Sequence, residues 1–425
     1  MKKVGVALLG LGTVGGGTYK ILTKNRDDIK KNYGVDLEIR HILEKDMSKV
    51  KALGANPDIV SCDINNILKD PEIKIVAEFF GGIEPAKSFL VQCLLAGKSI
   101  VTANKEMFSQ YWHELESAAK KGKAGVYFEA SCVGGVPVIR TLTESMQGNN
   151  IKCIMGIVNG TTNYILSKMA DEGLEYETVL KEAQKLGYAE ANPTADVDGY
   201  DSMYKLSILS SLAFHTKVPI DKIYREGISN ISKLDIEYGK KFGYTLKLLA
   251  IGKKENGKIE ARVHPAFIPS DHPLAAVKES FNAVHIVGDN VGDIMLYGRG
   301  AGDLPTGSAI VSDIVFASLQ SKHKYSSFKN NTDKVSDRGF NKDFQCEYYM
   351  RLTVKDVPGV IASISAKLAK FKISINSIQQ KVEGDKASVI FMLHRTSESS
   401  VKKAVEAIKE VDTVYSVDAI IRVEE

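Results

Sequence analysis

Apolar and polar positions in the first 130 residues alternate between two patterns. Short apolar runs predict buried strands, and stretches with apolar residues every three or four positions predict helices between them. Strands separated by helices are typical of a doubly wound α/β fold, whose parallel sheet is covered on both faces. The expected strands are Val4–Leu9, Leu37–Leu43, Ile73–Phe79, Ser99–Thr102 and Gly125–Glu129, and the expected helices are Gly17–Thr23, Pro85–Leu95 and Glu106–Lys120.

The pattern changes over residues 131–306, where helices follow one another before strand-like runs gather. This order predicts a second, α+β domain, and a further helix at 307–320 is expected to complete the first domain, 1–130. The expected helices are Pro137–Met146, Thr162–Glu172, Tyr176–Leu186 and Ser202–His215, and the expected strands are Lys152–Val158, Ile259–Ile268, Phe281–Val287 and Ile294–Leu296.

Residues 321–345 are rich in Lys, Ser, Asn and Asp and predict a polar linker. A compact pattern restarts at 346–425 and predicts a ferredoxin-like β-α-β-β-α-β unit. Its expected elements are the strands Glu347–Val354, Ile373–Gln379, Ala387–Leu393 and Val414–Val423 and the helices Val360–Lys370 and Ser400–Lys409.

Composition narrows the class of protein. A chain of 425 residues with 44% hydrophobic and 25% charged residues predicts a soluble globular protein of two or three domains. The 56 basic and 52 acidic residues are nearly balanced, and no stretch combines basic with aromatic residues, so we expect no nucleic-acid partner. The five cysteines form no CxxC pair, which argues against a disulfide framework or a structural zinc site and favours the cytoplasm.

The N-terminal end resembles a secretion signal only superficially. Lys2-Lys3 and the apolar run Val4–Leu9 are followed by several glycines rather than by a helical apolar core and a cleavage site. No later apolar run reaches the roughly 20 residues of a membrane-spanning helix, so we expect no membrane partner. Since the first strand begins almost at once, we expect no further catalytic domain ahead of it.

A glycine-rich turn joins the first expected strand to the first helix. In such G-x-G-x-x-G turns, one glycine makes the tight turn, one lets the backbone approach a pyrophosphate, and one lets helix and strand pack closely. The anion then binds N–H groups at the helix N-terminus. This predicts dinucleotide binding, with a purely structural turn as the alternative. The expected cofactor-binding residues are Gly10, Leu11, Gly12, Thr13, Val14 and Gly15.

Residues 183–205 concentrate acidic side chains before a helix. Four carboxylates fall within the twelve residues 190–201. Asp201 and Lys205 are four apart and share a helix face, which continues through apolar positions (Ile208, Leu209 and Leu212). A lysine on a buried face must be paired, and desolvation lowers its pKa toward that of a useful acid. A surface ion pair is the alternative.

The spacing in this stretch resembles the signature of homoserine dehydrogenases. That signature has an alanine, a glycine four residues on, Asn-Pro, Asp-x-x-Gly-x-Asp and a lysine four residues later, and Ala183–Lys205 fills every position. The resemblance implies NAD(P)H-dependent interconversion of L-aspartate 4-semialdehyde and L-homoserine by a Rossmann domain and a substrate-binding and dimerisation domain. It implies that Lys205 donates the proton, that Glu190 binds homoserine, and that Asp196 and Asp201 fix its amino group and orient the lysine.

Three other segments agree with this family. Lys105, which ends Val101–Lys105, would be a second catalytic lysine between nicotinamide and substrate, although a lysine that opens a helix is often merely solvated. Gly302, in the loop Gly298–Thr306, would approach the cofactor. The segment Glu129–Pro137 resembles a monovalent-cation loop, and the alternative is a turn without an ion. Its expected sodium ligands are Glu129, Cys132, Gly134 and Val136.

Glu44 and Lys45, at the end of the second expected strand, are alternative candidates for the residue that contacts the cofactor ribose. An acid suits the 2′-hydroxyl of NAD and a base suits the 2′-phosphate of NADP. The residues leave this choice open, and the family's frequent basic residue at the position of Lys45 favours NADP slightly.

The C-terminal unit resembles an ACT domain, a module that binds small amino acids at paired interfaces. This implies an amino-acid effector, with L-threonine as the candidate, and a homodimer or homotetramer. A dimerisation unit without a ligand is the alternative. The expected effector-binding residues are Asp356, Gly359 and Asn376. Two rival functions stay open: another Rossmann reductase of amino-acid metabolism, and a non-catalytic sensor of NAD(P) and amino acids.

Overall fold

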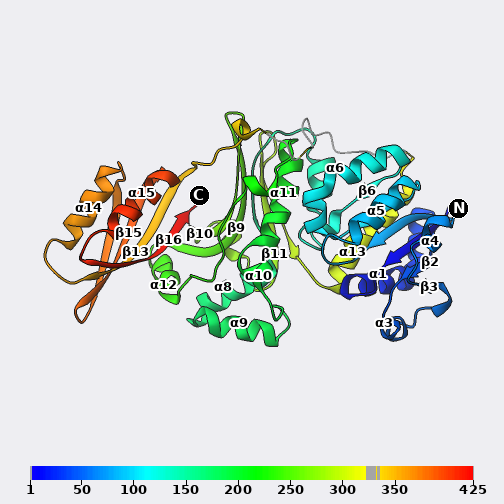
Figure 1. The fold of residues 1–425 in the computed structure, drawn as a ribbon, viewed down its shortest axis with the longest axis horizontal. Coiled ribbons are helices and arrows are strands. Elements are labelled where there is room, and N and C mark those ends of the chain that lie inside the picture. The colour runs from blue at the N-terminus through cyan, green and yellow to red at the C-terminus, as the bar shows by residue number, and fades with distance from the viewer. Residues whose placement is uncertain (1, 322–331, 333–335, 425) are drawn as a thin grey trace.

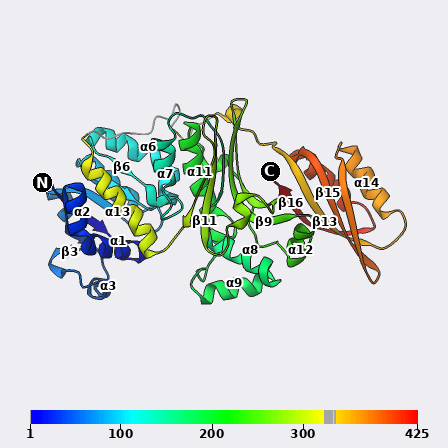
Figure 2. The ribbon, with the colours of Figure 1, turned by 180° about the vertical axis from the view of Figure 1, so that it is seen from behind.

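The computed structural model of the protein describes residues 2–321, 332 and 336–424. These residues form three lobes in a row, with the N-terminus in the first lobe and the C-terminus at the boundary between the other two (Figure 1). The view from behind shows the same order (Figure 2). In the described part of the chain, no helix combines the length and apolar character that crossing a membrane requires. Most of the expected linker at 321–345 lies outside the described residues.

The first lobe is a six-stranded parallel sheet with the order β3-β2-β1-β4-β5-β6. The strand order reverses between β1 and β4, and open α/β sheets bind ligands at such a point. The apolar run of β1 is buried on both faces, as a central parallel strand requires. The strands are β1 (Lys2–Leu9), β2 (Val35–Leu43), β3 (Val60–Ser61), β4 (Ile73–Glu78), β5 (Ser99–Thr102) and β6 (Val126–Tyr127), and the helices are α1 (Thr13–Lys24), α2 (Arg26–Tyr33), α3 (Met47–Ala52), α4 (Asn65–Lys69), α5 (Ala86–Leu95) and α6 (Lys105–Gly122).

Helix α13 (Asp303–Leu319) returns from the second lobe and packs on α1. Glycines permit this close approach. A Cβ atom on Gly17 would lie 2.1 Å from the carbonyl oxygen of Asp303, and one on Gly307 would lie 2.8 Å from the backbone nitrogen of Thr18. Any larger residue at either position would push the helices apart. Lys20 and Asp303 add an ion pair at 3.3 Å.

The second and third lobes share one ten-stranded sheet. Its main path is β12-β11-β7-β9-β10-β16-β13-β15-β14, and β8 pairs with β10. The strands are β7 (Ile151–Ile157), β8 (Tyr224–Arg225), β9 (Tyr244–Glu255), β10 (Lys258–Pro269), β11 (Phe281–Gly288), β12 (Gly292–Arg299), β13 (Gln345–Lys355), β14 (Ile375–Glu383), β15 (Lys386–Ser397) and β16 (Val414–Val423), and the helices are α7 (Val138–Arg140), α8 (Gly160–Glu172), α9 (Tyr176–Lys185), α10 (Thr194–Val197), α11 (Tyr200–Phe214), α12 (Lys233–Lys241), α14 (Val360–Lys370) and α15 (Glu398–Lys409).

The sequence predicts a third lobe that only a polar linker connects to the rest. In the structure, this lobe instead shares a continuous sheet with the second lobe. Its last strand, β16, runs parallel to β10 and pairs Arg422 with Ala266 and Val423 with Phe267. Within the lobe, the order β16-β13-β15-β14 with α14 and α15 is the expected ferredoxin-like arrangement. A short parallel pairing at a sheet edge leaves no signal in hydrophobic periodicity, which explains why the sequence pattern misses it.

Buried charges strengthen the junction of these two lobes. The Arg262 side chain is 1% exposed, and its guanidinium donates to the carboxylate of Glu424. It also forms an ion pair with Glu260 at 2.7 Å. Burial alone would raise the pKa of Glu424, but Arg262 and Lys253 outweigh it and hold this pKa at about 2. A charge-assisted pair that is fully desolvated is strong only while both partners are present.

Several predicted elements differ from the structure. The first helix begins at Thr13, not Gly17, because the glycine-rich turn already has helical backbone. The helix expected at Pro137–Met146 is split into α7 and a π-helical turn, Thr141–Ser145. The sequence pattern also misses β9, whose buried run does not alternate, and α12. The fold class is confirmed.

We predict that Glu424→Gln destabilises the protein by about 1.5–3 kcal/mol at neutral pH, because buried Arg262 loses its charged hydrogen bonds to Glu424 and keeps those to Glu260. The depressed pKa of Glu424 means that its contribution is complete above pH 4.5 and is lost as the pH falls toward 2. Urea denaturation between pH 7 and pH 3 measures both effects. The difference between wild type and variant should shrink with acidification, and exposed Glu410→Gln is the control. A variant as stable as wild type at pH 7 would contradict the role of the pair.

Candidate active site

A carboxylate bound between two lysines joins the first two lobes. Asp201 lies in the first turn of α11 and Lys205 one turn later. The Lys205 ammonium donates to Asp201 Oδ2 at 2.6 Å and to the carbonyl oxygen of Val158 at 2.7 Å. Lys105, at the start of α6 in the first lobe, places its Nζ 3.2 Å from Asp201 Oδ1. The predicted burial of Lys205 is confirmed, since only 8% of the residue is exposed.

Asn159 is a member of this cluster that sequence reasoning missed. Its Nδ2 donates to Asp196 at 2.7 Å and to Asp201 at 2.9 Å, while its Oδ1 accepts from the backbone N–H of Thr162. The last bond makes Asn159 the N-cap of α8. Asparagine before a helix start is a recognisable capping signal, but it does not reveal that the amide also binds two carboxylates.

The charges of the two aspartates are pushed in opposite directions. Burial raises the pKa of Asp201, but Lys205 and Lys105 outweigh it and leave this pKa well below its ordinary value. For Asp196, burial and then the neighbouring Asp201 raise the pKa. Asp201 raises the pKa of Lys105. The site therefore holds an ionised carboxylate, Asp201, beside cationic Lys105 and a second carboxyl, Asp196, whose pKa is raised.

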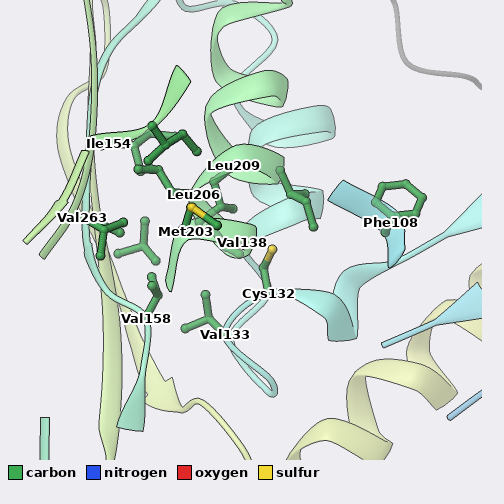
Figure 3. Close-up of a cluster of buried hydrophobic side chains, with 14 of the residues drawn as sticks. Phe108, Cys132, Val133, Val138, Ile154, Val158, Met203, Leu206, Leu209 and Val263 are labelled. Atoms are coloured by element: carbon green, nitrogen blue, oxygen red, sulfur yellow. The ribbon is translucent and has the colours of Figure 1, made fainter. Parts of the chain in front are cut away.

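Apolar side chains from the segments that contact Lys205 form a buried cluster. Cys132, Val133, Val158, Met203 and Leu206 belong to the buried cluster shown in Figure 3. The Cys132 thiol lies 3.9 Å from the carbonyl oxygen of Lys205, and burial raises its pKa to about 12. Apolar surroundings of this kind exclude water and strengthen the electrostatic interactions of the neighbouring charged cluster.

The start of α6, which carries Lys105, is fixed by a second buried carboxyl that sequence reasoning missed. Glu78, at the end of β4, accepts from the Thr102 hydroxyl at 2.5 Å and from the backbone N–H of Phe80 at 2.6 Å. Burial raises its pKa to about 7. Thr102 in turn accepts from the N–H of Asn104, which caps α6. The chain of bonds from Glu78 to Asn104 thus orients the residue before Lys105.

The glycine-rich turn borders a cavity of about 310 Å³ at the N-terminus of α1, which also reaches Lys20, Lys49 and Asp303. A Cβ on Gly12 would meet no atom within 4 Å, so this side of the backbone is open to a ligand. A Cβ on Gly15 would lie 2.3 Å from the carbonyl oxygen of Gly10, the close packing that the motif requires.

The structure also shows where the other residues of the cofactor prediction lie. The Glu44 carboxylate accepts from the backbone N–H of Leu11 at 2.7 Å and of Lys45 at 2.9 Å, so it braces the turn. The Lys45 side chain is exposed. Gly302 has φ +119° and directly precedes α13.

Glu129 is a buried carboxyl beside a second one, Asp313, which is ion-paired with Arg140 at 2.6 Å. The Glu129 carboxylate accepts from the backbone N–H groups of Ile139 and Arg140 at 2.8 Å each. Burial and then the nearby Asp313 raise its pKa to about 7. Cys132 and Val136 are buried, and Gly134 has φ +54°. The described residues contain no cluster of three His, Cys, Asp or Glu side chains, so a cation here would need backbone carbonyls.

Glu190 is not brought into the cluster. Its side chain is exposed, and no hydrogen bond or ion pair connects it to Lys205 or Asp201 within the described chain. Asp356 and Gly359 lie just before α14 in a different lobe, the third. The backbone N–H of Asp356 donates to Asp385 in the turn between β14 and β15, whereas Asn376 lies near the other end of β14, so the structure does not bring Asn376 to the other two.

Known proteins resemble every part of this architecture. Residues 10–129 match a family model described as the NAD-binding domain of homoserine dehydrogenase, residues 137–315 match homoserine dehydrogenase itself, and residues 348–413 match the ACT domain. The homoserine dehydrogenase of Corynebacterium glutamicum is 40% identical, over 99% of this chain and 96% of its own. The chain belongs to the homoserine dehydrogenase family.

Solved structures agree with this family. A homoserine dehydrogenase from Thiobacillus denitrificans superposes with a TM-score of 0.92 at 38% identity, over 100% of this chain and 99% of that one. One from Staphylococcus aureus gives 0.77 at 35% identity, over 100% and 99%. The protein is therefore a homoserine dehydrogenase by family, an oxidoreductase with a nicotinamide-cofactor domain and an ACT domain, and the resemblance drawn from the sequence is confirmed.

We predict that Asn159→Ser lowers kcat/KM for homoserine about 10- to 100-fold, the cost of one or two hydrogen bonds to charged groups. Serine is as good an N-cap as asparagine, so α8 should keep its start. Asn159→Ala, which also loses the cap, is the comparison. Steady-state kinetics and thermal melts should show similar activity in both variants and lower stability in the alanine variant. Full activity of Asn159→Ser would contradict the positioning role of the amide.

Proposed function

We propose that the chain catalyses the NAD(P)H-dependent interconversion of L-aspartate 4-semialdehyde and L-homoserine. The observation that carries this proposal is the Lys205–Asp201–Lys105 cluster at the junction of the cofactor lobe and the second lobe. A carbonyl oxygen that becomes an alkoxide needs cationic N–H donors, and two lysines supply them. A substrate ammonium needs carboxylates, and Asp196 and Asp201 supply these.

Lys205 is the proposed proton donor. Two of its three N–H groups are occupied by Asp201 and Val158, which leaves the third for the substrate oxygen. A bound nicotinamide dinucleotide supplies the hydride in reduction and accepts it in oxidation. Lys205 protonates the developing alkoxide in reduction, and neutral Lys205 accepts the hydroxyl proton in oxidation. Lys105, whose side chain is 40% exposed, adds a second positive charge near the same oxygen.

We assign the substrate ammonium to Asp196, Asp201 and Glu190. Asp196 and Asp201 are already held together by Asn159. Glu190 lies on the exposed loop between α9 and α10, so it would join the substrate from the solvent side.

NADPH is the proposed preferred cofactor. The turn Gly10–Gly15 and the N-terminus of α1 would hold the pyrophosphate, and Gly302 would approach it from the start of α13. Lys20 and Lys49 line the neighbouring cavity, where they are paired with Asp303 and Glu44, and the side chain of Lys45 is exposed. These cations favour a 2′-phosphate over a 2′-hydroxyl. A hyperthermophilic archaeal homoserine dehydrogenase with TM-score 0.64 and 29% identity, over 75% of this chain and 98% of that one, was solved with NADPH.

A monovalent cation, sodium in the first instance, is proposed for the loop after β6. Glu129 and backbone carbonyls at Cys132, Gly134 and Val136 would hold it. Burial and Asp313 raise the pKa of Glu129 although Arg140 is already paired with Asp313, and a cation bound beside Glu129 would stabilise its ionised form further. The ion would stabilise the connection between the first two lobes.

The third lobe is proposed to bind an amino acid, L-threonine as the candidate, with Asp356, Gly359 and Asn376. Exposed Ile378 and Val382 lie on β14, at the outer edge of the ten-stranded sheet, and would pair with a second copy. We propose a homodimer or homotetramer.

The five cysteines are free thiols, which supports a location in the cytoplasm.

We predict that Lys205→Ala keeps the fold and the affinity for NADPH but lowers kcat about 10²- to 10⁴-fold in both directions, the range of a lost general acid. NADPH fluorescence titration and initial rates with aspartate semialdehyde measure the two quantities.

Lys205→Arg is the matched variant for this prediction. Arginine keeps the positive charge beside Asp201 but has a pKa too high to donate a proton readily. It should therefore be nearly as inactive as the alanine variant. An arginine variant with most of the wild-type kcat would reduce Lys205 to an electrostatic role, and an alanine variant above about a tenth of wild-type kcat would remove the general-acid role.

A further inference from the structure

A short segment lies between the third lobe and the active-site turn. Residues 224–228 begin as strand β8, which runs parallel to β10 and pairs Tyr224 with Arg262. The backbone N–H of Glu226 then donates to the carbonyl oxygen of Val263 at 2.8 Å. We call residues 224–228 the strap. It is fixed along β10, the strand that also pairs with the last strand of the third lobe.

On one side the strap is bound to the third lobe. Arg422 of β16, with a side chain only 4% exposed, donates to the Tyr224 hydroxyl and to Glu226 Oε2, both at 2.7 Å. The Tyr224 hydroxyl donates to the same Glu226 oxygen at 2.9 Å. Arg422 is also bidentate to Glu398, the first residue of α15, at 3.0 and 2.7 Å. Charge-assisted bonds with this degree of burial define one geometry strongly.

On its other side the strap is bound to the turn that precedes α11. The Arg225 guanidinium donates to the carbonyl oxygen of Asp198 and lies 3.6 Å from the centre of the Tyr200 ring. The N–H of Ile228 donates to the carbonyl oxygen of Val197 at 2.8 Å. A Cβ on Gly227 would lie 2.4 Å from that same oxygen, so only glycine allows this approach.

The turn held in this way carries the chemistry of the site. Asp196 directly precedes Val197, and Asp201 directly follows Tyr200. Their carboxylates meet at Asn159, and Asp201 orients Lys205. A shift of the turn by a fraction of an ångström would therefore move the two carboxylates and the lysine together, and catalytic rates are sensitive to displacements of this size.

We infer that the strap positions the turn 197–201 and transmits the state of the third lobe to it, with Arg225 as the positioning residue. This inference rests on the proposed function only in its second half, which needs an amino-acid effector. Two of the expected effector residues, Asp356 and Gly359, directly precede α14, which packs on α15 through a shared core. Helix α15 holds Arg422 through Glu398, and Arg422 holds the strap. An effector changes the site only as far as its affinity differs between two positions of this chain of contacts.

The positioning half is tested without an effector. Arg225→Met should raise KM for homoserine and lower kcat by about 10-fold or more together, because the turn loses its fixed donor. KM for NADPH should stay within about twofold, since the cofactor cavity does not involve the strap. Arg225→Lys, which keeps a donor, should recover part of the loss. Wild-type kinetics in Arg225→Met would overturn the positioning role, and so would an equal loss in Arg225→Lys and Arg225→Met.

The transmission half is tested with L-threonine on the full chain. Tyr224→Phe removes one hydroxyl from the strap. Tyr349→Phe removes one hydroxyl from the same lobe junction, where Tyr349 donates to Asp235 of α12 at 3.0 Å. Calorimetry measures threonine binding, and the ratio of KM for homoserine with and without saturating threonine measures the coupling, which is about 5- to 150-fold in typical allosteric proteins.

We expect all three proteins to bind threonine, and Tyr349→Phe to keep the wild-type ratio. In Tyr224→Phe, the logarithm of that ratio should fall by at least about two thirds. If threonine binds and inhibits, but Tyr224→Phe responds like wild type, transmission through the strap is rejected while the proposed regulation stands. If threonine neither binds nor inhibits the wild type, the proposed effector and the transmission half fail together, and the Arg225 variants still decide the positioning half.

Discussion

The ionised carboxylate of Asp201 is the constraint on which the site depends. A buried anion is costly unless cations and hydrogen-bond donors surround it. Lys205 and Asn159 come from the same lobe as Asp201, whereas Lys105 comes from the first, so the anion has its second cation only when the two lobes are in contact. The same carboxylate therefore binds the proposed acid and connects the cofactor lobe to the second lobe.

A second set of buried charges serves the other end of the molecule. Arg262 and Glu424 form a buried pair across the junction of the second and third lobes, and Arg422, held by Glu398 within the third lobe, pairs with Glu226 across it. Together with the pairing of β10 and β16, they make the ACT unit part of one continuous sheet. A regulatory lobe attached in this way shares the rigidity of the catalytic lobe, so a change in one is mechanically available to the other.

Much of this architecture is predictable from the sequence because it depends on local patterns. The glycines of the first turn, the Asp201–Lys205 spacing and the restart at 346 each follow from backbone geometry or helical periodicity. Asn159 and Glu78 are not predictable in this way, since their roles arise from carboxylates and hydroxyls distant in sequence. The same holds for the pairing of β16, because one sheet edge does not reveal its partner in sequence periodicity.

The most direct test of the central claim is a crystal structure of the enzyme with NADP and L-homoserine. The account predicts that the hydroxyl oxygen of homoserine lies within about 2.6–3.2 Å of Lys205 Nζ, the reach of proton transfer, with Asp201 still bound to the same ammonium. The ammonium group of homoserine should contact Asp196. A hydroxyl group bound elsewhere, with Lys205 still occupied by protein atoms alone, would contradict the claim that the buried aspartate positions the acid.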